Sequence, residues 1–332
     1  MSAPVRWGFI GAGWIAHRAL GPAVHAADGA VIHAAAARDV DRARSLSPTV
    51  AYGAYEHLLG DDEVEAVYIS LHNSAHMPLT LAALEAGKHV LCEKPLGLTA
   101  DEVAQMADAA ARADRLLVEA TWTRWHPRTQ RAQALLATDA IGEVRSVDVG
   151  FCFSGVSPDN YRLDAERGGG ALYDLGPYSV GSVLWAVPDA PVNVADVAVD
   201  RHPGGVDLTT QATLRVGDAT ARARSSVDDD SGEWLRIEGT RGALEFSRPA
   251  HVSWLTPSTL SVWQGSGTRT EDEPSFVHHF APVDPYQLMA EHVSRAIRGD
   301  RSAYLLPVEE SLRVAHALDA IRTAASGAAE VG

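Results

Sequence analysis

The stretch Val5-Arg-Trp-Gly8-Phe-Ile10-Gly11-Ala-Gly13-Trp-Ile-Ala16 decides the fold of the first part of this chain. Val5–Ile10 is apolar enough for a strand buried on both faces, and Trp14–Ala27 has the pattern of a helix. The G-x-G-x-x-A spacing between them lets the backbone turn tightly and approach a pyrophosphate, which binds the free N–H groups at the helix start. This stretch therefore predicts a dinucleotide-binding turn.

The same alternation of strands and helices continues through the first third of the chain. Further strands are expected at Val31–Ala37, Val64–Ser70, His89–Glu93 and Leu116–Ala120, and helices at His76–Ala86 and from the capping box Thr99–Glu102 to Arg112. Such an alternation builds a parallel sheet with helices on both faces. We predict a Rossmann domain over residues 1–122.

After Trp122 the pattern changes to fewer helices and many consecutive strands. We expect helices at Pro127–Thr138, Leu172–Trp185, Tyr286–Ile297 and Val308–Ala325, a strand at Val144–Phe153, successive strands with short turns over Val192–Val262, and a loop at Gly265–Pro285. This order predicts an α+β domain over residues 123–332, with a large, mainly antiparallel, open-faced sheet. Its last helix is expected to pack back on the first domain. The fold class is α/β.

Composition limits the kinds of partner. A chain of 332 residues is long for one core, so two domains are expected. The net charge of −15 argues against nucleic acid and anionic membranes, because both require basic patches. Cys92 and Cys152 have no metal-ligand spacing, and packing is their expected role. No secretory signal or membrane-spanning apolar run is seen, so we expect a cytoplasmic protein.

The end of the second strand indicates which dinucleotide binds. NAD sites commonly place an acidic residue there to hold the ribose 2′-hydroxyl. This chain has Ala37 and Arg38, which leave space for a 2′-phosphate and can bind it. Asp39 lies near the ribose in one interpretation and caps the next helix in the other. We expect NADP, with NAD as the alternative.

Only two of the 28 basic residues are lysines, Lys88 and Lys94. An ammonium is a compact charge whose pKa burial can lower, whereas a guanidinium stays charged and is planar. Lys94 follows a strand at the edge where open parallel sheets bind ligands, so chemistry is expected there. Pro95 is a candidate for a cis peptide. Lys88 is expected in a turn, without a chemical role.

Several motifs together resemble one known family. They are the glycine turn, Asn73-Ser-Ala-His76, Gly87-Lys-His-Val-Leu-Cys-Glu93-Lys94-Pro95 and Gly168-Gly-Gly-Ala-Leu-Tyr-Asp174-Leu-Gly-Pro-Tyr178. The chain resembles the Gfo/Idh/MocA family over nearly its whole length. Within that family it is most similar to the dimeric dihydrodiol dehydrogenases and the NADP-dependent aldose (xylose) dehydrogenases. The cofactor-binding residues that follow are Gly11, Gly13, Trp14, Ile15, Ala37, Arg38, Asn73, His76, Glu93 and Lys94.

Asp174 and Tyr178 lie four residues apart in an expected helix, so their side chains share one face. A tyrosine that takes a proton needs a nearby positive charge to stabilise its phenolate. The resemblance implies that Tyr178 is the acid/base and Lys94 its electrostatic partner, while Asp174 orients the substrate or the lysine. The alternatives are aromatic packing for Tyr178 and helix N-terminal charge complementarity for Asp174.

Aromatic and polar side chains elsewhere are candidates for lining a substrate pocket. They suit a sugar ring, although core packing explains each of them almost as well: Trp122, Arg124, Phe151, Tyr161 and Arg162. The histidines show no spacing for metal ligation, and hydride transfer to a nicotinamide needs no metal, so no metal is expected.

The leading hypothesis is an NAD(P)-dependent oxidoreductase that acts on a sugar, a polyol or a trans-dihydrodiol. Two alternatives remain: a ketoreductase for nucleotide-linked deoxysugars, and a non-catalytic sensor that binds dinucleotide. A free face of the second sheet, together with the resemblance, predicts a homodimer or homotetramer.

Overall fold

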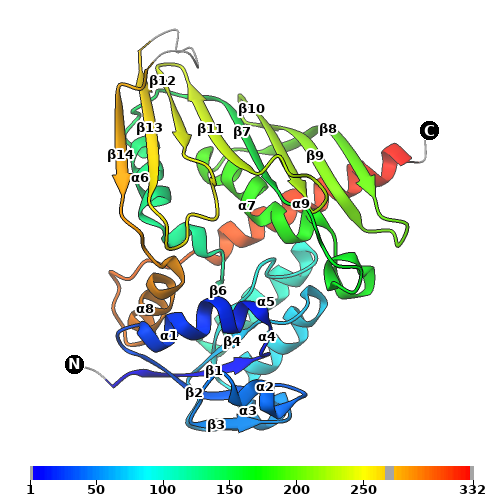
Figure 1. Ribbon diagram of the computed structural model, residues 1–332, viewed down its shortest axis with the longest axis vertical. Helices are drawn as coiled ribbons and strands as arrows, with labels where there is room; N and C mark the ends of the chain where they lie inside the picture. The colour runs from blue at the N-terminus through cyan, green and yellow to red at the C-terminus, as the bar shows by residue number, and fades with distance from the viewer. Residues whose placement is uncertain (1–2, 266–272, 330–332) are drawn as a thin grey trace. The chain divides into compact units, whose positions relative to one another are not determined.

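The computed structural model describes residues 3–265 and 273–329 (Figure 1). Contacts divide the chain into two compact units. The first unit is Met1–Trp125 with Asp284–Leu312, and the second unit is His126–Val283 with Arg313–Gly332. The assignment of residues 1–122 and 123–332 to a cofactor domain and a substrate domain stays a prediction.

A six-stranded parallel sheet forms the centre of the first unit, as expected. Its order is β3-β2-β1-β4-β5-β6, with β1 at Val5–Ile10, β2 at Ala30–Ala36, β3 at Val50–Tyr52, β4 at Ala66–Ile69, β5 at His89–Cys92 and β6 at Leu117–Glu119. The strand order reverses between β1 and β4. In open parallel sheets, ligands bind at such a reversal, outside the carboxyl ends of the strands.

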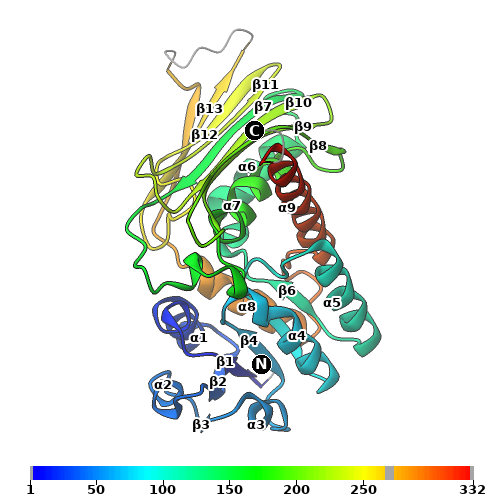
Figure 2. The ribbon, with the colours of Figure 1, turned by 90° about the vertical axis from the view of Figure 1, so that its right-hand side faces the viewer.

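Helices cover both faces of this sheet. They are α1 (Gly21–Ala26), α2 (Val40–Arg44), α3 (Tyr55–Leu59), α4 (His76–Glu85), α5 (Ala100–Ala113) and α8 (Pro285–Ile297). Helices α4 and α5 pack together, and α1 packs with α8 (Figure 2). The capping box is confirmed: Thr99 Oγ1 accepts from the N–H of Glu102 (3.1 Å), while the Glu102 carboxylate accepts from the N–H of Leu98 (2.7 Å).

Three details of the first unit differ from the sequence prediction. The helix expected over Trp14–Ala27 is interrupted by a π-helical turn at Ala16–Leu20, in which the Gly21 N–H bonds to the Ala16 carbonyl. Pro22 follows and has no N–H to donate, which accounts for the irregular turn before it. The short elements β3 and α3 were not expected, because three to five residues are too few to show a periodicity.

An eight-stranded sheet forms the second unit. Its order is β14-β13-β12-β11-β7-β10-β9-β8, with β7 at Val144–Cys152, β8 at Val192–Arg201, β9 at Asp207–Val216, β10 at Ala219–Ser226, β11 at Glu233–Gly239, β12 at Gly242–Phe246, β13 at Ser258–Gln264 and β14 at Phe276–Phe280. Neighbours are antiparallel except β7 and β10, which are parallel. The loop expected over Gly265–Pro285 is wrong at β14, where pairing with β13 overrides a weak local pattern; residues 266–272 lie outside the described residues.

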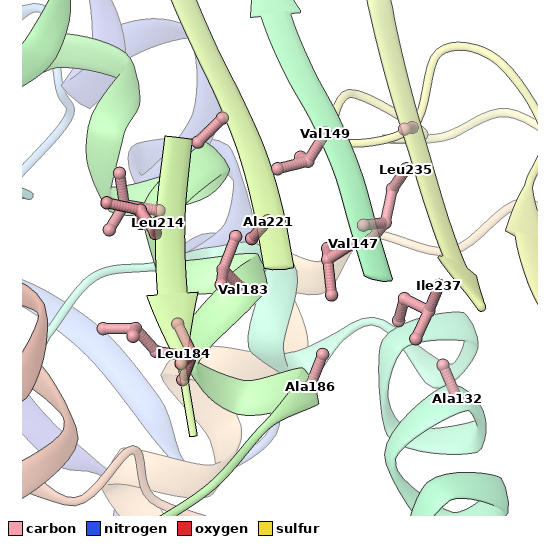
Figure 3. Packing of buried hydrophobic residues seen from close by; sticks show 14 of the residues in the cluster. Ala132, Val147, Val149, Val183, Leu184, Ala186, Leu214, Ala221, Leu235 and Ile237 are labelled. Atoms are coloured by element: carbon pink, nitrogen blue, oxygen red, sulfur yellow. The ribbon is translucent and has the colours of Figure 1, made fainter. Parts of the chain in front are cut away.

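Helices α6 (Pro127–Ala137), α7 (Ala171–Ala186) and most of α9 (Val308–Ala329) lie against one face of this sheet. Figure 3 shows the core between them, where Val183 and Leu184 of α7 meet Val147, Leu214 and other strand residues. The opposite face carries none of the described helices of this unit (Figure 2). The α/β fold class is confirmed.

Candidate active site

The glycine turn lies where the strand order of the first sheet reverses. Gly11 has φ +97°, and a Cβ there would lie 2.6 Å from the carbonyl oxygen of Ser70, so only glycine fits. At Gly13 the nearest atom to such a Cβ is 3.7 Å away, which leaves the backbone open to a ligand. Trp14 is 73% exposed in the first turn of the following helix, and Ile15 is half-buried. This geometry fits a pyrophosphate.

The residues after β2 have the arrangement expected for a 2′-phosphate site. Ala37 is buried and Arg38 is exposed; no hydrogen bond or ion pair of the Arg38 side chain occurs among the described residues. Asp39 caps α2 by accepting from the N–H of Asp41 (3.0 Å), which confirms the capping interpretation. Arg42, which sequence reasoning missed, donates to the carbonyl of Ala12 (2.7 Å) and so ties α2 to the glycine turn.

Lys94 follows β5 and is half-buried beside a buried carboxyl group. Burial raises the pKa of Glu119, at the end of β6, while bonds from Ser311 and the Leu96 N–H, and the charge of Lys94, act in the opposite direction. Glu93 is buried and accepts from the Tyr68 hydroxyl (2.7 Å). Sequence reasoning did not single out Glu119, although its place at the carboxyl end of a strand next to β5 was the available signal.

His76 supports the segment that carries Lys94. Its imidazole is fully buried and contacts the carbonyls of Pro95 (2.8 Å) and Leu71 (3.3 Å). Burial lowers the pKa of His76 to about 4, so the ring is neutral near pH 7. The Lys94–Pro95 peptide is cis, as expected. Direct contact of a cofactor with His76, or with the buried Asn73, stays a prediction.

The surroundings of Lys88 differ from those of Lys94. Its ammonium is buried and donates to the carbonyls of Asp61 (2.7 Å) and Val64 (2.8 Å). Burial lowers its pKa. These bonds fix the chain between α3 and β4, so Lys88 stabilises the fold.

Two substrate candidates of the first unit have partners within it. Trp122 is buried and stacks on Tyr286, with ring centroids 5.0 Å apart. Arg124 is buried and forms an ion pair with Glu310 (2.6 Å). Contact of either residue with substrate stays a prediction.

Asp174 and Arg162, which the sequence placed in different roles, form an ion pair in the second unit. Arg162 Nε donates to Asp174 Oδ2 (2.6 Å) and Nη2 to Oδ1 (3.2 Å), and Asp174 is only 3% exposed. Burial alone would lower the pKa of Arg162, but the Asp174 carboxylate raises it above its usual value. The Arg162 guanidinium also lies over the Tyr161 ring, 4.9 Å from its centroid.

The triple glycine permits this pairing. A Cβ on Gly169 would lie 2.5 Å from the carbonyl oxygen of Arg162, so the chain carrying Arg162 passes directly against the start of α7. Gly170 donates its N–H to that same carbonyl (2.8 Å). The loop that carries Arg162 is thereby held against the start of α7, next to Asp174.

Tyr178 is buried one helical turn beyond Asp174. Its ring lies 5.4 Å from that of Phe151 and 6.0 Å from that of His251, and its phenol is within electrostatic reach of Arg162. The structure thus brings together the second-unit candidates: Phe151, Tyr161, Arg162, Asp174 and Tyr178. His251 is an addition that the sequence did not indicate, because a single histidine between strands carries no recognisable pattern.

The described residues also lack two kinds of feature. No group of three or more histidine, cysteine, aspartate or glutamate side chains is placed to hold a metal ion there. No helix in the described ranges is both long and apolar enough to cross a lipid bilayer.

The glycine turn and the sheet topology define the first unit as a dinucleotide-binding Rossmann domain. Residues 5–121 match the model of the oxidoreductase family with an NAD-binding Rossmann fold, and residues 129–245 match the GFO/IDH/MocA C-terminal domain. The chain belongs to the Gfo/Idh/MocA family of oxidoreductases.

Its relatives include named dehydrogenases and a ketoreductase. The D-xylose 1-dehydrogenase (NADP(+)) 2 of Haloferax volcanii is 35% identical over 97% of this chain and 98% of its own length. The trans-1,2-dihydrobenzene-1,2-diol dehydrogenase of Danio rerio is 32% identical, covering 96% and 93%. A 3-ketoreductase from Actinomadura kijaniata, solved with NADP and TDP-benzene, is 26% identical over 97% and 98% of the chains, with a TM-score of 0.83.

Proposed function

We propose that this protein is an NADP-dependent dehydrogenase or reductase that acts on a carbinol carbon of an aldose, a polyol or a trans-dihydrodiol. The observation that carries the proposal is the grouping around Tyr178. A buried phenol lies among aromatic rings that suit a sugar or diol, with the charge of Arg162 within reach. The xylose and dihydrodiol dehydrogenases among the relatives support this substrate class.

In the direction of oxidation, Tyr178 takes the proton of the substrate hydroxyl as hydride leaves the carbon that bears this hydroxyl. The phenolate that accepts it needs positive charge, which we assign to Lys94, and the same ammonium can bond the developing alkoxide. Asp174 holds Arg162 and so sets the charge beside Tyr178. In reduction the same residues act in reverse, with Tyr178 donating the proton.

NADP, when bound, supplies the hydride acceptor in one direction and the donor in the other. We assign the pyrophosphate to the turn of Gly11, Gly13, Trp14 and Ile15, and the 2′-phosphate to Ala37 and Arg38. Asn73, His76, Glu93 and Lys94 are assigned to the nicotinamide side. The exposed Arg38 after β2, together with an Asp39 carboxylate that caps α2, supports NADP over NAD.

The test is a turnover assay at the absorbance band of the reduced nicotinamide. NADP and NAD are each offered with D-xylose, other aldoses, polyols and trans-1,2-dihydrobenzene-1,2-diol. Tyr178→Phe should lower kcat by about a hundredfold or more, with NADP affinity within about threefold of wild type, because the acid/base is lost. Near-wild-type turnover in that variant would remove Tyr178 from the mechanism.

A ketoreductase of nucleotide-linked deoxysugars is the second candidate, favoured by the likeness to the 3-ketoreductase solved with TDP-benzene. The two candidates differ in their affinity for thymidine diphosphate. Micromolar TDP binding to the NADP-loaded protein, with no turnover of free sugars, would favour the ketoreductase. Tight NADP binding without turnover of any substrate would instead favour a sensor, although a sensor has no need to retain Lys94, Asp174 and Tyr178.

We further propose a cytoplasmic homodimer or homotetramer that associates through the face of the second sheet without helices. Light scattering of the purified protein measures the number of subunits.

A further inference from the structure

His251 lies in a segment that is held from two sides. Ser247–Ser253 follows β12, and the buried guanidinium of Arg128 spans it. Arg128 donates to the carbonyl of Ser247 (3.0 Å), the carbonyl of Ala250 (2.6 Å) and the hydroxyl of Ser253 (3.0 Å). Arg128 is only 1% exposed, and this burial lowers its pKa to about 10. An arginine in this position fixes the course of the whole segment.

The second support comes from Glu233, in β11. Its Oε2 accepts the backbone N–H groups of His251 (2.6 Å) and Val252 (2.8 Å), and the carboxyl is buried. The backbone of His251 is thus fixed by a hydrogen bond to a buried carboxyl group. The position of its imidazole follows from this scaffold.

The imidazole of His251 packs against the residues that we assign to the reaction. It stacks on Phe151 with centroids 5.3 Å apart and planes 7° from parallel, and its centroid lies 6.0 Å from that of Tyr178. The side chain is 4% exposed. Burial lowers the pKa of His251 to about 3, the charge of Arg128 acts the same way, and a hydrogen bond to the Gly150 backbone opposes them only in part.

A neutral imidazole has one N–H and one lone pair. The Gly150 backbone uses the N–H, and Nε2 has no hydrogen-bond partner among the described residues. An unsatisfied buried acceptor costs stability, and a phenylalanine or leucine would pack on Phe151 without that cost. A purely structural role would therefore favour an apolar side chain at position 251, and a functional role accounts for the histidine.

We propose that His251 is a specificity-determining residue, whose unpartnered ring nitrogen accepts a hydrogen bond from a substrate hydroxyl beside the carbon that Tyr178 serves. The inference rests on the proposed function and deepens it. It implies that the substrate carries a second hydroxyl near the reacting carbinol, as sugars, polyols and trans-dihydrodiols do. A site built to bond a hydroxyl discriminates strongly against an analogue that lacks it.

The test compares His251→Phe and His251→Gln with wild type, using D-xylose and NADP. Phenylalanine keeps the ring stacking and removes the acceptor, so KM should rise about tenfold while kcat stays within about threefold. Glutamine retains an acceptor and should keep KM within about threefold of wild type. His89→Phe is the matched control: burial also lowers the pKa of His89 to about 4, but this histidine lies at the start of β5 in the first unit, where its ring accepts from the N–H of Leu116 (3.0 Å). It should leave KM unchanged even if the melting temperature falls.

Monodeoxy analogues of D-xylose give a second readout. The analogue that lacks the hydroxyl bonded by His251 should bind wild type and His251→Phe equally well, whereas the others should still distinguish them. An unchanged KM in a folded His251→Phe protein overturns the inference, as does an equal penalty with every analogue. If D-xylose is not turned over, its Kd for the NADP-loaded protein replaces KM, because this hydrogen bond affects binding whether or not hydride moves. Failure of the proposed function is thereby separated from failure of this inference.

Discussion

The two units hold their candidate residues by different physical means. In the first unit the residues around Lys94 stand near the carboxyl ends of parallel strands, and backbone groups help to hold them: His76 bonds to Pro95, and Glu119 bonds to Leu96. In the second unit the central feature is an ion pair, Arg162 with Asp174, set against helix α7. The first arrangement is dictated by the sheet, and the second by one long-range pairing of side chains.

This difference predicts how mutations behave. Where the sheet positions a residue, its side chain can change without loss of the fold, so activity and stability are separable. Where a buried ion pair positions a residue, changing its side chain affects activity and stability together. Substitutions in each unit can therefore test this contrast.

Lys94→Arg should give the largest effect, on activity alone. The guanidinium keeps the charge but is planar and larger, and it cannot place a compact ammonium beside the reacting oxygen. We expect kcat to fall by about a thousandfold, or about 4 kcal/mol in the barrier, with the free energy of unfolding nearly unchanged. Steady-state kinetics and urea unfolding measure the two quantities.

The other lysine is the control. Lys88→Arg must fit a larger group between the carbonyls of Asp61 and Val64, so it should lower the free energy of unfolding by about 1–3 kcal/mol and leave kcat within about twofold. A large loss of stability in Lys94→Arg would contradict the separation proposed for the first unit.

Asp174→Ala should reduce stability and activity together. It leaves the Arg162 guanidinium without its carboxylate, and breaking a buried pair in this way costs about 3 kcal/mol, the lower end of the usual range because Arg162 keeps 27% of its side chain exposed. Activity should fall as well, because the charge beside Tyr178 is no longer held in place. Urea unfolding and kcat are measured on the same preparation.

The double variant Arg162→Met with Asp174→Leu separates the two effects. Replacing both charges by apolar groups should restore much of the stability but none of the activity. Full stability in Asp174→Ala alone would show that the ion pair does not organise the second unit.

The contrast also explains what the sequence could and could not predict. The glycine turn, most of the strands and the place of Lys94 after β5 follow local patterns of a few residues and were predicted, whereas β3 and β14 were not. The partners of Arg124 and Asp174 were not predicted: Arg124 and Glu310 lie 186 residues apart, and no periodicity in one sequence links such a pair.

His251 and Glu119 illustrate the same limit in another form. Each was placed near an expected element, but its role depends on which neighbours surround it: Phe151 and Tyr178 for His251, and Lys94 for Glu119. Burial and contact are properties of the folded chain. Most element positions could therefore be predicted from this sequence, whereas the pairing of polar side chains that lie far apart in the sequence could not.

The contrast can also be tested by the pH dependence of the free energy of unfolding, to which His76 contributes. Its pKa is about 4 in the folded protein and near 6.5 in the unfolded chain, so the unfolded state binds more protons between these values. This contribution to stability is complete above pH 6.5 and is lost as the pH falls toward 4. Between pH 7 and pH 5 the loss from this one group should be about 2 kcal/mol.

His76→Asn should reduce the slope of the unfolding free energy against pH. The reduction should be at most the slope that corresponds to one bound proton. The difference in slope between wild type and variant isolates His76 from the other buried histidines. Equal slopes would mean that His76 is not buried as a neutral ring, and that the segment carrying Lys94 is supported in another way.

Arg38→Ala should give the smallest effect, and it concerns the cofactor alone. Because the side chain is exposed, its removal should not change the free energy of unfolding. Loss of one charge-assisted contact with a 2′-phosphate should weaken NADP binding by about tenfold and leave NAD binding unchanged. Arg42→Ala is the counterpart: it frees the carbonyl of Ala12 in the turn that both cofactors use, so it should weaken NADP and NAD alike. Fluorescence titration of each variant with each cofactor yields four ratios. If Arg38→Ala weakens NAD binding as much as NADP binding, then Arg38 supports the glycine turn and does not bind the 2′-phosphate. The residues of the first unit would then affect fold and function together, as those of the second unit do.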